Sequence, residues 1–597
     1  MTAPLKPAGR TLAEFQPLKP AEQKLLDACR QGEFANISDK RPEAVNDDNV
    51  VRAAFLRFLA LGGDEKNPVH EHGVQLFGAW IEGVLDMVAA RVPSDLFIFD
   101  CHFDSTPVFR GAKIAGTLNL GSCQLPGFIG DSLACEGNLF LHQDFSSTGT
   151  VRLRGAQIGG DIECRRAKFD GMEGDALSAD GVVVQGSIFL NQKFTSMGEV
   201  RLLNARIGGN LDCGSAQFDG VNGDALSVDG AVIKGNVFLR EGFSAMGTVR
   251  LSGTHISGNI ECYDAKFDGK DGDALMADGM VVEGTFFFRN LTIPVNGVSL
   301  AASRVGRLAD DAISWGERLT FNGFTYDSIA GDAPTDVITR LAWLDKQHKV
   351  HAGLRLNGDS TGFKPQPWRQ LAKVLREMGH AEDARQVSIA FEDRLRKANL
   401  IGQTPKHWGK FRSWVYRKVS RAGHWLFGVL TGYGYRPLRL LSWMFGVWLV
   451  CAMFYWYAAA GQGVFAPSNP LVFQNPAYAV CRPDYVVPAT QLGNAAPPII
   501  QGAGNWYLCE KLPEEYSGFS PLAYSLDVIL PLVDLQQETG WAPLIPTAKA
   551  AWYQELLSIF DWKHFTRLLL WFEILFGWVS SLLLVAVVSG LTKRREE

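Results

Sequence analysis

The sequence predicts a mainly β protein, a right-handed parallel β-helix with helical caps that is followed by two C-terminal transmembrane helices. The segments that begin at Val151, Val200 and Val249 read VRLRGAQIGGDIECRRAKF, VRLLNARIGGNLDCGSAQF and VRLSGTHISGNIECYDAKF, so the motif recurs every 49 positions. Such a repeat is typical of a stacked solenoid. Two apolar runs, 440–460 and 568–591, carry at most one charge each and have the length that a helix needs to cross a membrane.

Residues 1–62 are expected to form an N-terminal helical cap. The opening MTAPLKPAGRTLAEFQPLKP is polar and marked by prolines, so it contains no apolar signal segment. The segments PAEQKLLDACRQGEF and VRAAFLRFLALGG then read as helices that close one end of the β-helix. We therefore expect the chain up to about residue 400 to stay in the cytoplasm.

Residues 63–331 are expected to form the β-helix itself. A glycine before each short apolar strand recurs in steps that alternate between 26 and 23 positions, and each step is about one turn of a β-helix. Weaker copies extend this pattern from Gly73 to about Gly331, so about ten coils stack into a rod on the order of 40 Å long. The clearest glycines are Gly160, Gly186, Gly209, Gly235, Gly258 and Gly284.

Alternation within each coil indicates which side chains point inward, because successive residues of a strand face opposite ways. Five positions keep their size and polarity from repeat to repeat and should form core ladders. In the first repeat they are Ile158, Ile162, Cys164, Ala167 and Phe169. Cysteine at such a position acts as a small apolar residue. Its copies, two coils and about 10 Å apart, are too distant for a disulfide.

One outward position carries a stripe in which phenylalanine and acid alternate from coil to coil. An exposed apolar stripe on a soluble surface is typical of a docking site. The alternative is that the N-terminal or central helices cover it. The interaction stripe consists of Phe140, Glu163, Phe189, Asp212, Phe238, Glu261 and Phe287.

The turns carry aspartates between glycines, as in FDGMEGDALSADG from Phe169. Stacked carboxylates can bind calcium, because this hard cation takes several oxygen ligands. Asp and Gly are also the ordinary residues of tight turns, and the nine-residue period of calcium-binding β-rolls is absent. We favour turn chemistry. The weak calcium candidates are Asp170, Asp175, Asp219, Asp224, Asp268 and Asp273.

Residues 332–400 are expected to form a helical hairpin that caps the second end of the β-helix. The segment PQPWRQLAKVLREMGHAEDARQVSIAFEDRLRKA places apolar residues at helical spacing on both sides of Gly379. It resembles one tetratricopeptide unit, with Trp368, Gly379 and Ala384 at fitting offsets and Ser388 as a departure. One unit cannot build a peptide groove, which needs several stacked repeats.

Residues 401–436 are expected to form a basic amphipathic helix at the membrane interface. Aromatic residues interleave with a basic face at helical spacing, a pattern that suits a helix lying on anionic lipid. A charged lead-in to the first span is the alternative. The interfacial residues are Trp408, Lys410, Arg412, Trp414, Arg417, Lys418 and Arg421.

The two spans set the predicted topology. Basic residues stay on the cytoplasmic side, and they precede the first span and follow the second. Both termini should therefore be cytoplasmic. The segment between the spans should lie outside, and it holds two cysteines, Cys481 and Cys509, for which we expect a disulfide. The boundaries are 437–460 for the first span, 461–566 for the extracytoplasmic domain, 567–591 for the second span and 592–597 for the tail.

Acidic residues near the second span have two interpretations each. Glu573 interrupts an apolar run, where an ionisable residue is a functional candidate by default; the favoured alternative is that it snorkels to the outer surface, about one turn away. Asp527, Asp534 and Glu538 fall at roughly helical spacing and can form an acidic face for cations or a partner. A solvated surface is the favoured alternative.

The chain resembles a group of uncharacterised bacterial two-span membrane proteins, related to pentapeptide-type β-helices and often labelled membrane-associated oxidoreductases. The resemblance covers most of the chain. The resemblance implies that the protein lies in a bacterial inner membrane, and the label implies a redox activity. The resemblance is carried by the repeats and by LLDACRQGEF, VRAAFLRFLALGG, HGVQLFGAWIEGVLDM, KPQPWRQLAKVLREMGHAEDARQV, LTGYGYRPLRLL and YSLDVILPLVDLQQETGW.

No cofactor is predicted from the residues. The sequence has no GxGxxG between a strand and a helix, no CxxC and no haem or iron–sulfur spacing. Two histidine clusters, His70-Glu71-His72 and His348 with His351, lack further ligands at readable spacing. The net charge of −5 disfavours nucleic-acid binding. An enzyme is therefore not the class that we favour.

Three functions stay open. The favoured one is a membrane-anchored scaffold or sensor that recruits an unknown protein partner, since a repeat surface without a pocket is typical of binding. The alternative is a two-span pore with a regulatory β-helix, in which YSLDVILPLVDLQQETGW returns to the membrane, although the TVGYG filter is absent. The third is the oxidoreductase of the family label. The oligomeric state is open and includes a homo-oligomer.

Overall fold

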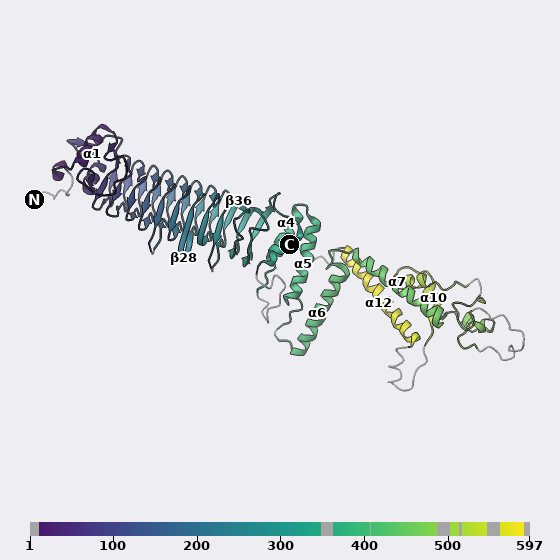
Figure 1. Cartoon of the computed structure of the whole chain (residues 1–597). Helices are drawn as coiled ribbons and strands as arrows, with labels where there is room; N and C mark the ends of the chain where they lie inside the picture. The colour runs from purple at the N-terminus through teal and green to yellow at the C-terminus, as the bar shows by residue number, and fades with distance from the viewer. Residues whose placement is uncertain are drawn as a thin grey trace, which may run out of the picture. The chain divides into compact units, whose positions relative to one another are not determined.

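The computed structural model describes residues 11–172, 174–270, 272–347, 362–405, 407–485, 502–512, 516–545 and 561–589. The chain divides into two compact units, Met1–Leu400 and Ile401–Glu597. The first unit contains a solenoid, and helices precede and follow it in the sequence. The second unit contains two long apolar helices (Figure 1).

The first unit is a parallel β-solenoid of about 11 turns, visible in Figure 1 as a stack of coils. One turn contains four short strands: β18 (Gln157–Ile158), β19 (Ile162–Glu163), β20 (Lys168–Asp170) and β21 (Leu177–Ser178). Each pairs in parallel with a strand one turn along, as β18 does with β22 (Val183–Val184). The predicted parallel β-helix is therefore confirmed.

Two faces of the solenoid carry the candidate residues of the sequence analysis. The face with the interaction stripe contains β15 (Leu139–Phe140), β19, β23 (Ile188–Phe189), β27 (Leu211–Asp212), β30 (Val237–Phe238), β33 (Ile260–Cys262) and β36 (Val281–Phe288). The face that leads into the aspartate turns contains β16 (Ser146–Ser147), β20, β24 (Thr195–Met197), β28 (Gln217–Ser227), β31 (Ser244–Arg250) and β34 (Lys266–Asp268).

The predicted core ladders are buried. Their positions in the three repeats are at most 2% exposed, from Ile158 to Phe267. Phenylalanines of successive coils form a column whose neighbouring ring centroids are 5.1 to 5.6 Å apart. Burying one such side chain contributes about 1.5–3 kcal/mol. The column consists of Phe145, Phe169, Phe194, Phe218, Phe243 and Phe267.

A polar ladder explains the recurring glycines. Asn138 Oδ1 accepts a hydrogen bond from the backbone N–H of Asp161 in the next coil (2.7 Å), and Asp161 Oδ1 accepts one from Ser187 (2.6 Å). A Cβ at Gly160 would lie only 1.9 Å from Asn138 Oδ1. Glycine is therefore needed where the side chain of the previous coil approaches the backbone. The ladder continues through Asn210, Asn236, Asn259 and Thr285.

The solenoid begins earlier than predicted, inside the segment assigned to the N-terminal cap. β1 (Ala35–Asn36) pairs in parallel with β5 (Val74–Phe77), and β2 (Val50–Arg52) pairs with β6 (Trp80–Glu82). The assigned boundary at residue 62 therefore needs correction. Strands of two or three residues outside the repeat show too little alternation to be recognised in the sequence.

Helices close the last coil. Gln366 Nε2 donates to the Phe324 carbonyl oxygen (2.9 Å), and Gln370 Nε2 donates to that of Tyr326 (2.7 Å). An edge strand presents unpaired backbone groups, and these amides satisfy two of them beside β40 (Thr325–Ile329). The helices of the first unit are α1 (Pro20–Gln31), α2 (Ala53–Ala60), α3 (Val337–Asp345), α4 (Gln366–Glu377) and α5 (Ala381–Lys397).

The second unit contains the membrane candidates. α7 (Arg439–Gln462) and α12 (Trp562–Val588) are long and apolar enough to cross a membrane, with mean hydropathies of 1.5 and 2.1. The tail at 592–597 lies outside the described residues. The shorter elements are α6 (Lys410–Thr431), α8 (Pro470–Phe473), α9 (Pro521–Ile529), α10 (Gln537–Gly540) and the antiparallel pair β41 (Phe465–Pro467) and β42 (Trp541–Pro543).

We expect Phe218→Ala to destabilise the solenoid by about 3–5 kcal/mol, because it removes a ring from the buried column and leaves a cavity. Urea unfolding of the full chain, followed by far-UV circular dichroism, measures the loss. Met197→Ala is the matched control: this side chain is 54% exposed, so the change should stay within about 0.5 kcal/mol. Equal losses in both variants would contradict the assigned core.

Candidate functional site

The interaction stripe lies along one face of the solenoid in the predicted order. Strand pairing places Phe140 beside Glu163, Glu163 beside Phe189, and so on to Phe287, one residue from each of seven successive turns. All seven side chains are half-buried. Since strands stack about 4.8 Å apart, the phenylalanines recur about every 10 Å.

Arginines cover phenylalanines of the stripe. The guanidinium carbon of Arg165 lies 4.4 Å from the Phe189 ring centroid, and that of Arg240 lies 4.1 Å from the Phe238 centroid. Arg240 also forms an ion pair with Glu261 (2.5 Å). The stripe is therefore a mixed aromatic and charged surface rather than a bare apolar one. The sequence held this signal, because each arginine follows a stripe residue by two positions and so shares its face.

Three aspartates act within their own turns. Each accepts a hydrogen bond from the backbone N–H two residues further along, at 2.8 to 3.1 Å. This is the ordinary Asx-type use of aspartate in a turn. The three are Asp170, Asp219 and Asp268.

Two of the other calcium candidates face arginine. Asp175 lies 3.7 Å from Arg201 Nε, and Asp224 lies 3.5 Å from Arg250 Nε, so a guanidinium competes with a metal ion for each of these two carboxylates. Asp273 takes the equivalent place in the third repeat, where Ser299 occupies the strand position of the two arginines. Across the described residues, no group of three or more His, Cys, Asp and Glu is placed to hold a metal ion.

The cysteines of the core ladders are buried thiols that are not activated as nucleophiles. Burial raises the pKa of the Cys164, Cys213 and Cys262 thiols. The thiolate, not the thiol, is the nucleophile and the metal ligand. Since burial keeps these side chains in the thiol form, they act as apolar filler in the core.

The histidine cluster near the N-terminus is a packing contact. The His70 and His72 rings meet edge to face with centroids 4.4 Å apart, and His72 Nδ1 lies 3.0 Å from the Gly32 carbonyl oxygen. The other cluster, His348 with His351, lies outside the described residues.

α6 leaves aromatic and aliphatic side chains exposed. Phe411, Trp414 and Val419 are 78%, 57% and 65% exposed, and the Arg412 guanidinium stacks 3.9 Å from the Trp408 ring centroid. The basic residues Lys410, Arg412, Arg417 and Lys418 are exposed and Arg421 is half-buried. This combination of exposed apolar and basic groups suits a lipid interface.

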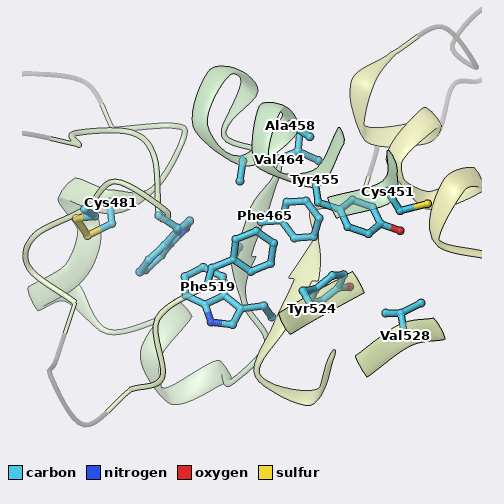
Figure 2. Packing of buried hydrophobic residues seen from close by; sticks show 14 of the residues in the cluster. Cys451, Tyr455, Ala458, Val464, Phe465, Cys481, Phe519, Tyr524 and Val528 are labelled. Atoms are coloured by element: carbon cyan, nitrogen blue, oxygen red, sulfur yellow. A yellow bond between two sulfur atoms is a disulfide. The ribbon is translucent and has the colours of Figure 1, made fainter. Parts of the chain in front are cut away.

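The segment between α7 and α12 folds around an aromatic core, shown in Figure 2. The Phe519 ring centroid lies 4.4 Å from that of Phe465 and 5.3 Å from those of Tyr524 and Trp541. All four side chains are buried. Tyr455 of α7 joins the same cluster (Figure 2), so this core fixes the segment to the apolar helix.

Cys481 and Cys509 form the disulfide that the sequence predicts, with Cα atoms 5.5 Å apart. Both are buried against the aromatic core. The bridge closes a loop that includes 486–501, which lies outside the described residues.

α9 packs between α7 and α12, beside their apolar middles. Trp448 Nε1 of α7 donates to the Leu522 carbonyl oxygen (2.9 Å), and the Ser525 hydroxyl contacts the Trp448 carbonyl oxygen (3.0 Å). A Cβ at Gly577 of α12 would lie 2.3 Å from the Ile529 carbonyl oxygen. The segment between the two apolar runs therefore places a helix alongside them, within the stretch that the pore alternative expects to return to the membrane.

Glu573 does not snorkel, so the favoured interpretation of this residue is wrong. Its side chain is 0% exposed. The Tyr455 hydroxyl donates to Glu573 Oε2 (2.7 Å), Ser525 Oγ contacts Glu573 Oε1, and the Cys451 thiol lies beside the carboxyl. The sequence could not reveal this cluster, because its members come from α7, α9 and α12.

Asp527 does not belong to an acidic surface. It is 6% exposed and accepts hydrogen bonds from the backbone N–H groups of Leu535 (2.7 Å), Gln537 (2.9 Å) and Glu538 (2.9 Å). Asp534 and Glu538 are exposed, as the favoured interpretation of a solvated surface expects, and Asp534 Oδ1 accepts a hydrogen bond from the Gln536 backbone N–H (2.8 Å). Only Asp527 departs from that interpretation, because it forms an internal tie between α9 and α10.

No family model, curated protein or solved structure matches this chain. The arguments on function therefore rest on the geometry of the stripe, of α6 and of the cluster around Glu573.

We expect Cys164, Cys213 and Cys262 to resist iodoacetamide in the native protein, because burial raises their pKa and blocks access. Mass spectrometry of tryptic peptides should find these thiols unmodified in native buffer and alkylated after denaturation in guanidinium. The control is Met197→Cys, at a position that is 54% exposed in the original protein, and it should react in both conditions. Native alkylation of the core thiols would refute their structural role.

Proposed function

We propose that the protein is a scaffold or sensor at the bacterial inner membrane, in which a cytoplasmic β-helix anchored by α7 and α12 recruits a protein partner. The single observation that carries this is the interaction stripe, whose aromatic and acidic side chains alternate over seven turns, with arginines stacked on two of the rings. A repeated outward surface is suited to an extended partner. The net charge of −5 argues against nucleic acid as that partner.

Anionic lipid is the second proposed partner. α6 precedes α7 in the chain and presents exposed aromatic and basic side chains. Basic residues near a span attract the anionic cytoplasmic leaflet, at about 1 kcal/mol for each residue near the surface. The same charges favour cytoplasmic termini and an outer location for most of 461–566.

A two-span pore is the alternative, and the position of α9 supports it. A short helix packed between two apolar helices is compatible with a segment that re-enters the membrane from one side. A path for ions would then require several copies around one axis. The oxidoreductase of the family label is the third candidate and would require a bound cofactor.

Native mass spectrometry of the protein in a nanodisc discriminates these functions. A monomer or dimer that retains only lipid would support the scaffold. A closed symmetric oligomer would support the pore, and a retained flavin or nicotinamide would support the oxidoreductase.

Removing two rings of the stripe should abolish partner recruitment without unfolding the protein. We expect the Phe189→Ser, Phe238→Ser variant to lose about 1–2 kcal/mol of stability, since each cation–π contact is worth about 0.5–1 kcal/mol. Crosslinking in cells, read by mass spectrometry, should show specific adducts disappear. The control carries Met197→Ser and Met246→Ser, at exposed positions off the stripe, and should keep these adducts. Unfolding of the stripe variant would assign the rings to structure instead.

Charge reversal on α6 should weaken binding to anionic lipid. For a peptide spanning 407–431, we expect each of Lys410→Glu, Arg417→Glu and Lys418→Glu to lower the partition constant on phosphatidylglycerol vesicles by about fivefold or more, from about 1 kcal/mol per charge. Tryptophan fluorescence measures the partitioning. Lys410→Arg and Lys418→Arg keep the charge and should bind as the original does. Equal binding to neutral phosphatidylcholine vesicles would show that charge plays no part.

A further inference from the structure

The chain from α9 to α10 forms a hairpin whose two arms are joined by hydrogen bonds to the Asp527 side chain. α9 begins at Pro521, its last residue Ile529 reaches the backbone of α12 at Gly577, and the chain then returns to α10. The Asp527 carboxylate holds the returning backbone through three N–H groups. Backbone at membrane depth is tolerated only where its polar groups are satisfied within the protein, and Asp527 supplies this for the hairpin.

Glu573 lies where this hairpin meets both apolar helices. It is five residues inside the apolar run that starts at Leu568, or about 8 Å along the helix axis. Tyr455 contacts it from α7 and Ser525 contacts it from α9. Contacts to Glu573 therefore tie three separate elements together.

The hydrogen bonds around Ser525 determine the protonation state. The Ser525 hydroxyl lies within hydrogen-bond distance of the Trp448 carbonyl oxygen and of Glu573 Oε1. A hydroxyl has one proton to donate, and a carbonyl oxygen can only accept. Both bonds form at once only if the Ser525 hydroxyl donates to the Trp448 carbonyl oxygen and its oxygen accepts a hydrogen bond from the O–H of a protonated Glu573 carboxyl.

The other oxygen of Glu573 fits the same arrangement. Tyr455 donates to Oε2, which is the carbonyl oxygen of a carboxylic acid that carries its proton on Oε1. The carboxyl group then makes two hydrogen bonds and the Ser525 hydroxyl makes two. An ionised Glu573 would leave one of the Ser525 contacts without a hydrogen.

Positive charge is missing around Glu573 among the described residues. The titratable groups that face the site are Cys451 and Tyr455 on α7 and Tyr524 on α9, and the nearby acids on the hairpin are Asp527 and Glu538. No lysine, arginine or histidine in the described ranges forms an ion pair with Glu573. A buried carboxylate without a cation is strongly disfavoured.

We propose that Glu573 is a proton-binding site in the membrane unit, and that its proton holds the α9–α10 hairpin between α7 and α12. When the proton leaves to water, a carboxylate remains in an apolar site and the Ser525 bond to Trp448 or to Glu573 is lost. The hairpin then loosens so that water reaches the charge. Rising pH therefore opens the hairpin, and falling pH closes it. This inference concerns the second unit and is independent of the partner of the solenoid.

The proton itself can be detected by infrared spectroscopy. Full-length protein in nanodiscs is measured before and after Glu573→Gln, and the difference spectrum at neutral pH should contain the carbonyl band of one protonated carboxyl, shifted in deuterium oxide. Identical spectra would overturn the proposal. Glu538→Gln, which alters an acid on the same hairpin, is the matched control and should leave that band in place.

Hydrogen exchange tests whether the proton on Glu573 holds the α9–α10 hairpin in place. In the original protein, exchange of the 521–529 amides, corrected for the intrinsic base-catalysed rate, should accelerate at least about tenfold between about pH 6 and about pH 9. Glu573→Gln should abolish this acceleration, because its amide can donate to Ser525 and accept from Tyr455 at every pH. Equal acceleration in the two proteins would overturn the claim that the Glu573 proton holds the hairpin.

A further measurement uses no variant and so holds even if Glu573→Gln does not fold. The carboxyl band and the 521–529 exchange are followed in the original protein over the same pH range. The proposal expects one midpoint for both. Two distinct midpoints would separate the proton from the hairpin and contradict it.

Discussion

The stacking of one coil on the next is the constraint on which the solenoid depends. Every turn must present its backbone N–H and carbonyl groups to its neighbours in register, and the polar ladder through Asn138, Asp161 and Ser187 fixes that register with side-chain oxygens. The ladder leaves no room for a Cβ at Gly160. Glycine and the polar residue after it therefore recur together, and the inward ladders of Ile, Cys and Phe stay aligned from turn to turn.

Aligned coils also align whatever points outward. Phenylalanine and acid alternate on neighbouring turns because the repeat contains two unequal coils. The arginines two positions along then stand over the rings. A guanidinium above a ring shields apolar area while keeping its own charge in water. This explains how the solenoid carries a row of half-buried phenylalanines on its surface.

The second unit follows a different rule. α7 and α12 are apolar, and what distinguishes one arrangement of them from another is where their few polar groups find partners. Glu573, Tyr455 and Ser525 come from three elements and satisfy one another, whereas Asp527 satisfies the hairpin backbone. In an apolar environment an unpaired polar group costs several kcal/mol, by order of magnitude. These side chains therefore specify how α9 fits against α7 and α12.

The sequence by itself determined the parallel solenoid, its core ladders, the order of the interaction stripe and the two apolar helices, because each follows from a period or a length that is local in the chain. The Cys481–Cys509 pair also followed, since no other cysteine lies in that segment. Only the tertiary structure decided that the first coil starts near Ala35, that Asp527 is internal and that Glu573 is buried against Tyr455 and Ser525. These facts depend on contacts between residues far apart in the chain, up to 118 positions in the case of Tyr455 and Glu573. A local sequence pattern does not indicate which distant residues come into contact.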